Sequence, residues 1–390
     1  MYRKGVCYDV GRVMMGGNWR PKFDPKTFHG ELTIIKDDLH CNSVRICGFD
    51  EDRLASAAED ALAQGLEVWL SPEMWDRRPD ETLQYIVRAA TRAEELRQRW
   101  PGKLVLSLGS ELTLFMKGIV EGDNFFERLN NPAFWEIVRT GRHNASLNDF
   151  LGKSAKSVRE VFHGQITYFS VPLEQVDWGP LDFVGVDFYR DSRIRDAYGE
   201  MVKSYKQHGK PVVIGEFGCC TYTGAEKLGG NGFMVVFGMM EQLLNPKIAL
   251  PPTVAEMIKV IPQADGHYIR DEGLQARELA DQLEVLDNAG VEGAFVFTFV
   301  SPNSPVNADP RFDSDLGSFS LVKSYPEGET ADEFARQASR QGKLMLGVDL
   351  DTKLLERLYT DVGRHGKAFP EMPWDPKESF YAVSSYYLNH

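Results

Sequence analysis

Eight short runs rich in apolar and β-branched residues, separated by segments of helical periodicity, constrain the fold of this chain more than any other feature. Most of the runs are almost continuously apolar, as expected for parallel strands that are covered on both faces. Alternation of strand and helix eight times over favours a closed (β/α)8 TIM barrel over an open doubly wound sheet. The predicted strands are Gly5–Tyr8, Ser43–Cys47, Glu67–Ser71, Leu104–Leu108, Gln165–Phe169, Phe183–Phe188, Val212–Glu216 and Ala294–Phe299.

The segments between the runs predict the outer helices of such a barrel. The clearest helical patterns are Glu51–Gln64, Glu81–Arg99, Ser146–Val161 and Gln275–Ala289. We also expect a last helix over Ser379–Tyr387, capped by residues 374–378 and with aromatic residues on its inner face.

The chain is long enough for one elaborated barrel. Its 390 residues exceed the roughly 250 that a (β/α)8 barrel typically needs, so we expect a single domain over residues 1–390. The extra length lies in three insertions, at about residues 117–144, 222–272 and 327–372. The first two follow strands four and seven and therefore belong to the face where barrel enzymes build their active sites.

Composition excludes several classes of partner. The formal net charge of −13, from 44 basic and 57 acidic residues, disfavours nucleic acids and anionic membranes, because its field repels phosphates. No window approaches 18 uninterrupted apolar residues and no apolar stretch of signal-peptide length follows the first residues, so we expect a cytoplasmic protein without a membrane helix. The sequence leaves the oligomeric state open.

Cofactor and metal motifs are not found in the sequence. No G-x-G-x-x-G follows the first strand, no phosphate loop or G-x-S-x-G elbow is present, and the eight histidines form no ligand spacing. The five cysteines are odd in number and match no zinc pattern, which favours buried reduced thiols. We therefore expect neither a cofactor nor a metal.

Two glutamates stand at the ends of predicted strands four and seven. Glu111 follows the apolar run at 104–110, and Glu216 ends the run at 211–215. Residues at these strand ends can face each other across the mouth of a barrel. Retaining glycosidases need two carboxyl groups about 5–5.5 Å apart, one as acid/base and one as nucleophile. A single glutamate of this kind usually forms a salt bridge, but the pair on these two strands favours catalysis.

On these residues the chain resembles glycoside hydrolase clan A, the retaining barrel glycosidases with the acid/base on strand four and the nucleophile on strand seven. The turn Gly215-Glu216-Phe217-Gly218 is similar to the clan's nucleophile turn. The resemblance implies that Glu111 is the acid/base and Glu216 the nucleophile. It also implies that Arg45 braces Glu216 and that Tyr189, in the segment Val186-Asp187-Phe188-Tyr189, donates to it, which places Asp187 beside the site.

The chain departs from the clan at two positions. Ser110 stands before Glu111, where the clan has an asparagine that holds the sugar's 2-hydroxyl group. Strand eight lacks the clan's tryptophan, which leaves Phe297 or Phe299 as the floor of the sugar site. The full-length pattern is also similar to that of bacterial barrel proteins sometimes labelled abortive phage infection proteins.

Four further side chains are candidates with two interpretations each. Asp9 follows strand one and either contacts substrate or caps a turn. Trp75 either stacks on a sugar or packs beneath its loop, and its neighbour Glu73 either binds hydroxyls or is an exposed loop carboxylate. Tyr222, shortly after the nucleophile turn, either reaches the site or does not.

Two functions follow from the sequence as expectations. The first is retaining hydrolysis, or transglycosylation, of a small intracellular glycoside by Glu111 and Glu216. The second is a barrel that binds a sugar or metabolite without turnover, in regulation or defence, which Ser110 and the missing tryptophan favour. Retention of both glutamates with Arg45 and Tyr189 favours the enzyme.

Overall fold

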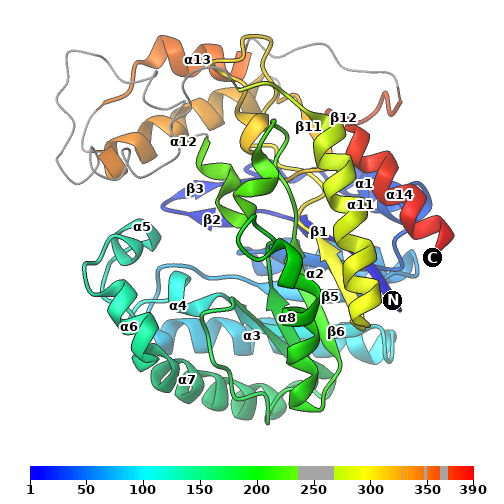
Figure 1. The fold of residues 1–390 in the computed structure, drawn as a ribbon, viewed down its shortest axis with the longest axis vertical. Coiled ribbons are helices and arrows are strands. Elements are labelled where there is room, and N and C mark those ends of the chain that lie inside the picture. Colours follow the sequence, from blue (N-terminus) through cyan, green and yellow to red (C-terminus); the bar gives the residue numbers. More distant parts are fainter. Residues whose placement is uncertain (236–267, 327, 347–348, 361–367) are drawn as a thin grey trace.

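A computed structural model describes residues 1–235, 268–326, 328–346, 349–360 and 368–390 of the chain. Eight parallel strands close into a barrel in the order β1-β10-β9-β8-β7-β6-β5-β4, so that barrel strands adjacent in the sequence are adjacent in the barrel. Figure 1 shows the fold, coloured along the sequence. The predicted (β/α)8 barrel is confirmed, and all eight predicted strands are present. They are β1 (Arg3–Asp9), β4 (Ser43–Gly48), β5 (Glu67–Pro72), β6 (Leu104–Ser110), β7 (Gln165–Ser170), β8 (Val184–Asp187), β9 (Val212–Phe217) and β10 (Gly293–Val296).

The last barrel strand ends earlier than the predicted Ala294–Phe299. The strand stops at Val296 because the backbone then finds partners outside the ladder. The N–H of Thr298 donates to the carbonyl of Phe319, and the N–H of Phe299 donates to that of Cys7. The chain thus turns across the mouth of the barrel, and Phe297 and Phe299 lie beyond the strand.

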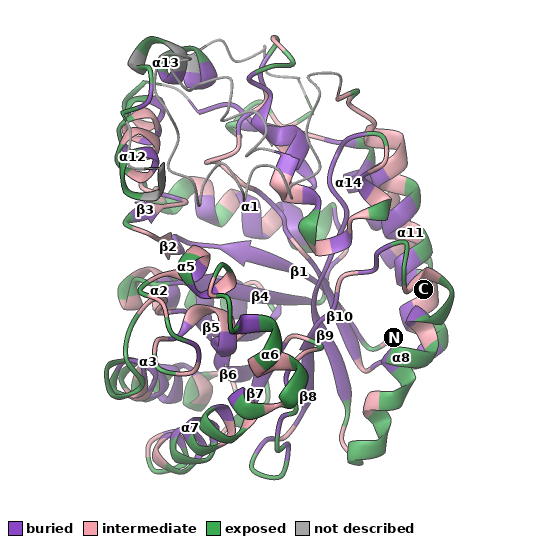
Figure 2. Cartoon of the chain, turned by 60° about the vertical axis from the view of Figure 1, so that its left-hand side comes forward, coloured by how far each residue is buried: buried purple, intermediate pink, exposed green. Residues whose placement is uncertain are grey.

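Helices surround the barrel, and their exposed sides face outward (Figure 2). The predicted helices are confirmed within a few residues as α2 (Glu51–Ala63), α3 (Pro79–Arg99), α7 (Arg142–Arg159) and α11 (Glu272–Ala289). Two helices that the sequence reading did not name complete the layer, α1 (Pro25–Asp37) and α8 (Tyr198–Ser204). Side-chain carboxylates cap the N-termini of several helices. For example, Asp50 accepts from the N–H groups of Asp52 and Arg53 at the start of α2.

One connection departs from strict alternation. The chain between β7 and β8, residues 171–183, contains no helix. The predicted eightfold alternation was therefore wrong at this position. The short segment Trp178-Gly179-Pro180 turns the chain there, and proline and glycine disfavour a helix in so short a link.

Large side chains fill the interior of the barrel. One buried cluster there combines Cys7, Trp69, Val105, Phe169, Phe183, Val213 and Phe295. Trp69 packs against Phe183 and Phe295, with ring centroids 4.9 and 5.5 Å apart. The strands are buried along almost their whole length (Figure 2). Because the interior is packed, a site has room only above it, at the carboxyl ends of the strands.

The predicted insertions carry elements of their own. Residues 117–144 contain α5 (Phe125–Leu129) and α6 (Phe134–Thr140), after the short α4 (Leu112–Phe115). Residues 327–372 contain α12 (Glu329–Leu346) and α13 (Thr352–Thr360), and α12 lies beside the hairpin of β2 (Val13–Met14) and β3 (Gly17–Asn18). Residues 236–267 of the insertion 222–272 lie outside the described residues; its described part holds the 3-10 turns η3 (Ala225–Lys227) and η4 (Gly229–Met234). Two further 3-10 turns flank α8, η1 (Arg195–Ala197) and η2 (Tyr205–His208), and a fifth is η5 (Ser314–Gly317).

The predicted closing helix is confirmed as α14 (Glu378–Asn389), which packs against α11. Its inner face buries Phe380 and Tyr387, whereas Tyr381 is exposed. The predicted cap at 374–378 was wrong: Lys377 occupies the N-cap position without a side-chain cap, and β12 (Trp374–Pro376) pairs antiparallel with β11 (Val322–Ser324). Among the described helices, none has both the length and the apolar character needed to cross a bilayer.

Candidate active site

Three carboxylates meet at the mouth of the barrel. One oxygen each of Glu111, Asp187 and Glu216 lies within 4.8 Å of the others. Glu111 comes directly after β6, Asp187 ends β8, and Glu216 lies near the end of β9. The structure therefore brings together the two glutamates that the sequence paired, at a separation close to the roughly 5–5.5 Å of retaining glycosidases.

Irregular strand ends aim these side chains inward. The ladder between β6 and β7 shifts register between Ser107 and Ser110, and Glu111 then takes a left-handed conformation with φ 51°. The ladder between β8 and β9 shifts beside Asp187, which places Asp187 opposite Glu216. Bulges of this kind re-aim side chains at barrel rims.

The glycine before Glu216 is required by a close approach. A Cβ atom at Gly215 would lie 2.2 Å from the ring of Phe169 and 2.5 Å from Oδ1 of Asp187. Both neighbours belong to the packed barrel and cannot withdraw easily. A glycine at 215 thus lets Asp187 and Glu216 share one face of the site.

Three donors surround the carboxylate of Glu216. The hydroxyl of Tyr189 donates to Oε2 at 2.9 Å, as the resemblance implied. Nη2 of Arg12 donates to Oε1 at 3.0 Å, and Nη1 of Arg45 lies 3.4 Å from the same oxygen. Two cations and one hydroxyl therefore hold the carboxylate of Glu216 in one orientation.

Arg45 contacts three carboxylates, those of Asp187, Glu216 and, at 3.6 Å, Glu73. Its Nη1 donates to Oδ1 of Asp187 at 2.9 Å, a shorter contact than that to Glu216, and its guanidinium lies 3.8 Å from the centre of the Phe169 ring. Ser110 donates to the other oxygen of Asp187 at 2.6 Å. The hydroxyl that replaces the clan's asparagine is thus engaged with a buried carboxylate.

Arg12 is the functional residue that the sequence reading missed. Its Nε and Nη2 donate to the two oxygens of Glu73, at 2.6 and 3.0 Å, and both side chains are almost fully buried. Asp9 holds the turn before it, since its Oδ1 accepts from the N–H groups of Gly11 and Arg12 at 2.7 and 3.0 Å. Asp9 therefore caps a turn, and Glu73, far from being an exposed loop carboxylate, orients Arg12 toward Glu216.

Burial and neighbouring charge shift the protonation of the other two carboxyl groups. Burial, reinforced by the charges of Asp187, Glu216 and Glu174, raises the pKa of Glu111 well above its ordinary value, and Arg45 opposes the shift. Burial also raises the pKa of Asp187 to about 7, against the lowering effect of Arg45. A raised pKa keeps Glu111 protonated at higher pH, which is what a general acid requires.

Aromatic rings line one side of the carboxylates. The guanidinium carbon of Arg12 lies 5.7 Å from the ring of Trp19, 5.9 Å from that of Trp75 and 5.3 Å from that of Phe297. Trp75 also stacks on Phe115, with ring centroids 4.3 Å apart. These rings are only partly buried, so they remain available for a ligand.

Two of the candidates lie away from the carboxylates. Phe299 is fully buried against Tyr8 and Trp374, so Phe297 is the strand-eight phenylalanine that lies at the site. Tyr222 is buried as well, donates to the carbonyl of Gly232 and packs against Tyr268.

The three carboxylates are also the one group of described residues whose spacing could hold a metal ion. A cation, however, already lies among them. Arg45 contacts both Asp187 and Glu216, and Arg12 contacts the same oxygen of Glu216. We therefore assign these carboxylates no metal.

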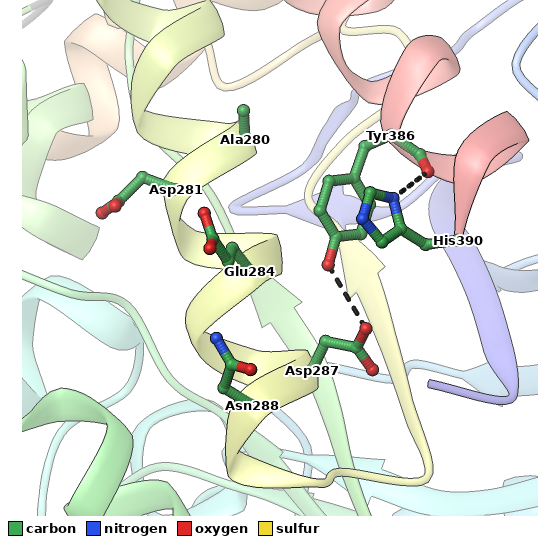
Figure 3. Close-up of a pocket in the computed structure, with 7 residues that line it drawn as sticks. All are labelled: Ala280, Asp281, Glu284, Asp287, Asn288, Tyr386 and His390. Carbon is green, nitrogen blue, oxygen red and sulfur yellow. Dashed lines mark hydrogen bonds between the residues drawn. The ribbon is translucent and has the colours of Figure 1, made fainter.

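A separate hollow lies on the outside of the barrel. It measures about 440 Å³ and is lined by α11 and α14, through Asp281, Glu284, Asp287, Tyr386 and His390 among others (Figure 3). Tyr386 donates to Asp287 there, and His390 bonds to the carbonyl of Tyr386. Its residues belong to the helical layer and not to the strand ends, so it plays no part in the carboxylate chemistry.

Comparisons with known proteins point to the same architecture. A GH113 β-1,4-mannanase is 13% identical in sequence, and the match covers 100% of this chain and 99% of that one with a TM-score of 0.51. The chain has the (β/α)8 barrel fold of GH113 mannanases. Two β-glucuronidases match with the same TM-score of 0.51, from Parabacteroides merdae at 13% identity and Bacteroides uniformis at 14%; 99% of this chain matches 36% and 37% of theirs. No family model and no curated protein sequence matches this chain.

The fold expected from the clan resemblance is thereby confirmed, since GH113 mannanases are barrels of that clan. At these identities the likeness concerns the fold alone. The likeness to proteins labelled abortive phage infection proteins stays a prediction.

Proposed function

We propose that this protein is a retaining glycoside hydrolase, with Glu111 as acid/base and Glu216 as nucleophile. The observation that carries the proposal is the carboxylate pair, whose oxygens lie within 4.8 Å of each other. This separation leaves no room for the water that inverting glycosidases place between carboxyl groups about 6.5–9.5 Å apart.

The surroundings of each glutamate support its role. Protonated Glu111 gives its proton to the glycosidic oxygen as the bond to the anomeric carbon breaks, and a Glu216 oxygen forms an ester with that carbon. Ionised Glu111 then takes a proton from water, which attacks the anomeric carbon and releases Glu216 as a carboxylate. Arg12, Arg45 and Tyr189 stabilise that carboxylate as the nucleophile of the first step and the leaving group of the second.

The charges favour a neutral glycoside. Both guanidinium groups at the described site are already paired with carboxylates, Arg12 with Glu73 and Arg45 with Asp187. An anionic sugar would have to compete with these buried partners, at a desolvation cost. We propose a small neutral glycoside, hydrolysed or transferred to an acceptor hydroxyl, and the mannanase fold neighbour makes mannosides the first substrates to test.

The role of Glu111 is tested by Glu111→Ala with Glu59→Ala as the control, because Glu59 lies half-exposed on the outer helix α2. With phenyl glycosides, which need an acid, the rate of Glu111→Ala is expected to fall by about 10²–10⁴-fold. With 2,4-dinitrophenyl glycosides the first step persists, and azide yields a glycosyl azide of retained configuration. Equal rates of Glu111→Ala and Glu59→Ala on phenyl glycosides would contradict the assignment.

A second candidate is a barrel that binds a sugar without turnover, in regulation or defence. It is favoured by Ser110, whose hydroxyl proton is donated to Asp187 and is therefore not available to a sugar's 2-oxygen. If the protein only binds a sugar, a neutral sugar is expected to raise the melting temperature equally in wild type and Glu216→Ala. No product is expected to form.

A further inference from the structure

Another buried carboxylate contacts the backbone that follows Glu111. Glu174 belongs to the helix-free connection between β7 and β8, and it is 6% exposed. Its oxygens accept hydrogen bonds from the hydroxyl of Tyr168 at 2.9 and 3.1 Å, from the N–H of Thr113 at 3.0 Å and from the N–H of Val171 at 3.3 Å. All of these groups are donors and favour the ionised form of Glu174, whereas burial raises its pKa.

The same contacts hold the backbone that follows Glu111. Tyr168 is fully buried, and its hydroxyl oxygen accepts from the N–H of Leu112 at 2.8 Å while its proton goes to Glu174. The N–H of Glu111 itself donates to the carbonyl of Phe169 at 2.9 Å. Three consecutive N–H groups, those of residues 111–113, are therefore held by the segment from β7 to Glu174.

These hydrogen bonds hold the backbone of Glu111 in a strained conformation. Glu111 adopts a left-handed conformation with φ 51° and ψ 41°, which costs a residue other than glycine of order 1 kcal/mol or more and persists only where neighbours impose it. Without partners, the N–H groups of Leu112 and Thr113 would be buried and unpaired, which is costly too. The contacts of Tyr168 and Glu174 thus maintain the backbone turn that aims Glu111 at Glu216.

We propose that Glu174, acting through Tyr168 and the N–H of Thr113, is a positioning residue that holds Glu111 as the general acid. The inference rests on the proposed function of Glu111. Among the described residues, the hydrogen bonds of Glu174 go to Tyr168, Thr113 and Val171, so Glu174 acts on the site through the turn that follows Glu111.

The charge of Glu174 also favours the protonated form of Glu111. The charged and titratable groups that face Glu111 are Asp187 on β8, Glu216 on β9, Glu174 on the β7–β8 connection, Arg45 on β4, and the hydroxyls of Tyr168 and Tyr189. After burial and the charges of Asp187 and Glu216, the charge of Glu174 contributes to the raised pKa of Glu111, whereas Arg45 lowers it. Neutralising Glu174 therefore favours ionisation of Glu111.

The test that needs no substrate is a carbon-13 NMR titration of protein labelled at the glutamate carboxyl groups, with the Glu111 signal assigned by its loss in Glu111→Gln. In Glu174→Gln the titration midpoint of Glu111 is expected to fall by roughly half a pH unit or more. The control is Glu278→Gln, which removes a buried, arginine-paired carboxylate on α11 and is expected to leave the midpoint unchanged. An unchanged midpoint in Glu174→Gln would overturn the proposal.

A second variant covers the case in which Glu174→Gln does not fold. Tyr168→Phe keeps the buried ring and removes the hydroxyl that links Leu112 to Glu174. Hydrogen exchange of the peptide spanning residues 111–116 is expected to accelerate at least several-fold in Tyr168→Phe and to match wild type in Glu278→Gln. Exchange at the wild-type rate in Tyr168→Phe would overturn the positioning role.

A kinetic readout separates this inference from the proposed function. In Glu174→Gln, the rate with phenyl glycosides is expected to fall about tenfold. The burst of dinitrophenolate released in the first step from 2,4-dinitrophenyl glycosides, which needs no acid, is expected to keep its wild-type rate. Equal losses on both substrates would overturn the positioning role. Failure of wild type to turn over any glycoside would overturn the proposed function, and Glu111 would then not be a general acid. The two substrate-free measurements would still report whether Glu174 holds Glu111.

Discussion

Nη2 of Arg12 lies 3.0 Å from Oε1 of Glu216, although 204 positions separate the two residues in the sequence. The same Nη2 and the neighbouring Nε also donate to the two oxygens of Glu73. Arg12 therefore joins the loop after β1, the end of β5 and Glu216 on β9 into one buried ion-pair network. The network fixes the orientation of Glu216 before any substrate arrives.

Replacing Arg12 is expected to destabilise the protein as well as its site. Arg12→Ala leaves Glu73 buried without its bidentate partner, and we expect a loss of about 3 kcal/mol in the free energy of unfolding. Urea unfolding measures this loss, with the exposed Arg78→Ala as the control, expected within about 0.5 kcal/mol of wild type. An Arg12→Ala protein as stable as Arg78→Ala would show that the Arg12–Glu73 pair does not form.

The hydroxyl of Tyr189 is expected to act on the rate and little on stability. Tyr189→Phe removes one donor from Oε2 of Glu216, and we expect about a tenfold slower formation of the glycosyl-enzyme with a loss of stability of roughly 1 kcal/mol. The matched control is Tyr198→Phe, which removes a buried hydroxyl that donates at 2.8 Å to the carbonyl of Phe188. Pre-steady-state kinetics and urea unfolding of both variants separate the two effects. Equal rates in the two variants would refute the role of Tyr189.

The buried carboxyl of Asp187 predicts a pH dependence of stability. Its pKa is about 7 in the folded protein and near the ordinary 3.8 in the unfolded chain, so the folded state binds the extra proton. This contribution to stability is complete below about pH 4 and is lost as the pH rises to about 7, with a slope approaching 1.4 kcal/mol per pH unit. Thermal unfolding between pH 4 and 8 should show a flatter profile in Asp187→Asn. Profiles of equal slope would contradict the raised pKa.

Chelation is expected to leave the protein unaffected. Arg45 and Arg12 already supply positive charge beside the three carboxylates, so the proposed chemistry needs no metal. We expect incubation with EDTA to change neither the melting temperature nor the rate on an activated glycoside. A loss of activity that Mg²⁺, Mn²⁺ or Zn²⁺ restores would mean that the carboxylate group binds a metal.

The fold could be predicted from the sequence because its determinants are local. Each barrel strand is a short apolar run, and burial on both faces leaves little alternative for such runs. The predicted end of the last strand was wrong. The N–H groups of Thr298 and Phe299 donate to the carbonyl groups of Phe319 and Cys7, and no local pattern around residue 297 encodes those distant contacts.

The candidate site was predicted in part for the same reason. Glu111 and Glu216 follow recognisable strands, and Tyr189 follows another. Arg12 lies in a loop without any motif, and its partners Glu73 and Glu216 are 61 and 204 positions away. Glu174 gave no signal either, since its role depends on backbone N–H groups of another connection. A buried arginine is recognised only once the fold brings its carboxylates together.

The central claim is covalent catalysis at Glu216, and trapping tests it most directly. Wild type and Glu216→Ala are incubated with a panel of 2,4-dinitrophenyl 2-deoxy-2-fluoroglycosides, neutral sugars and a glucuronide included, and the intact-protein mass is measured. We predict a single sugar adduct on wild type alone, with a neutral sugar, mapped to the peptide that contains Glu216. An adduct that forms equally on Glu216→Ala, or no adduct across the panel, would contradict the claim.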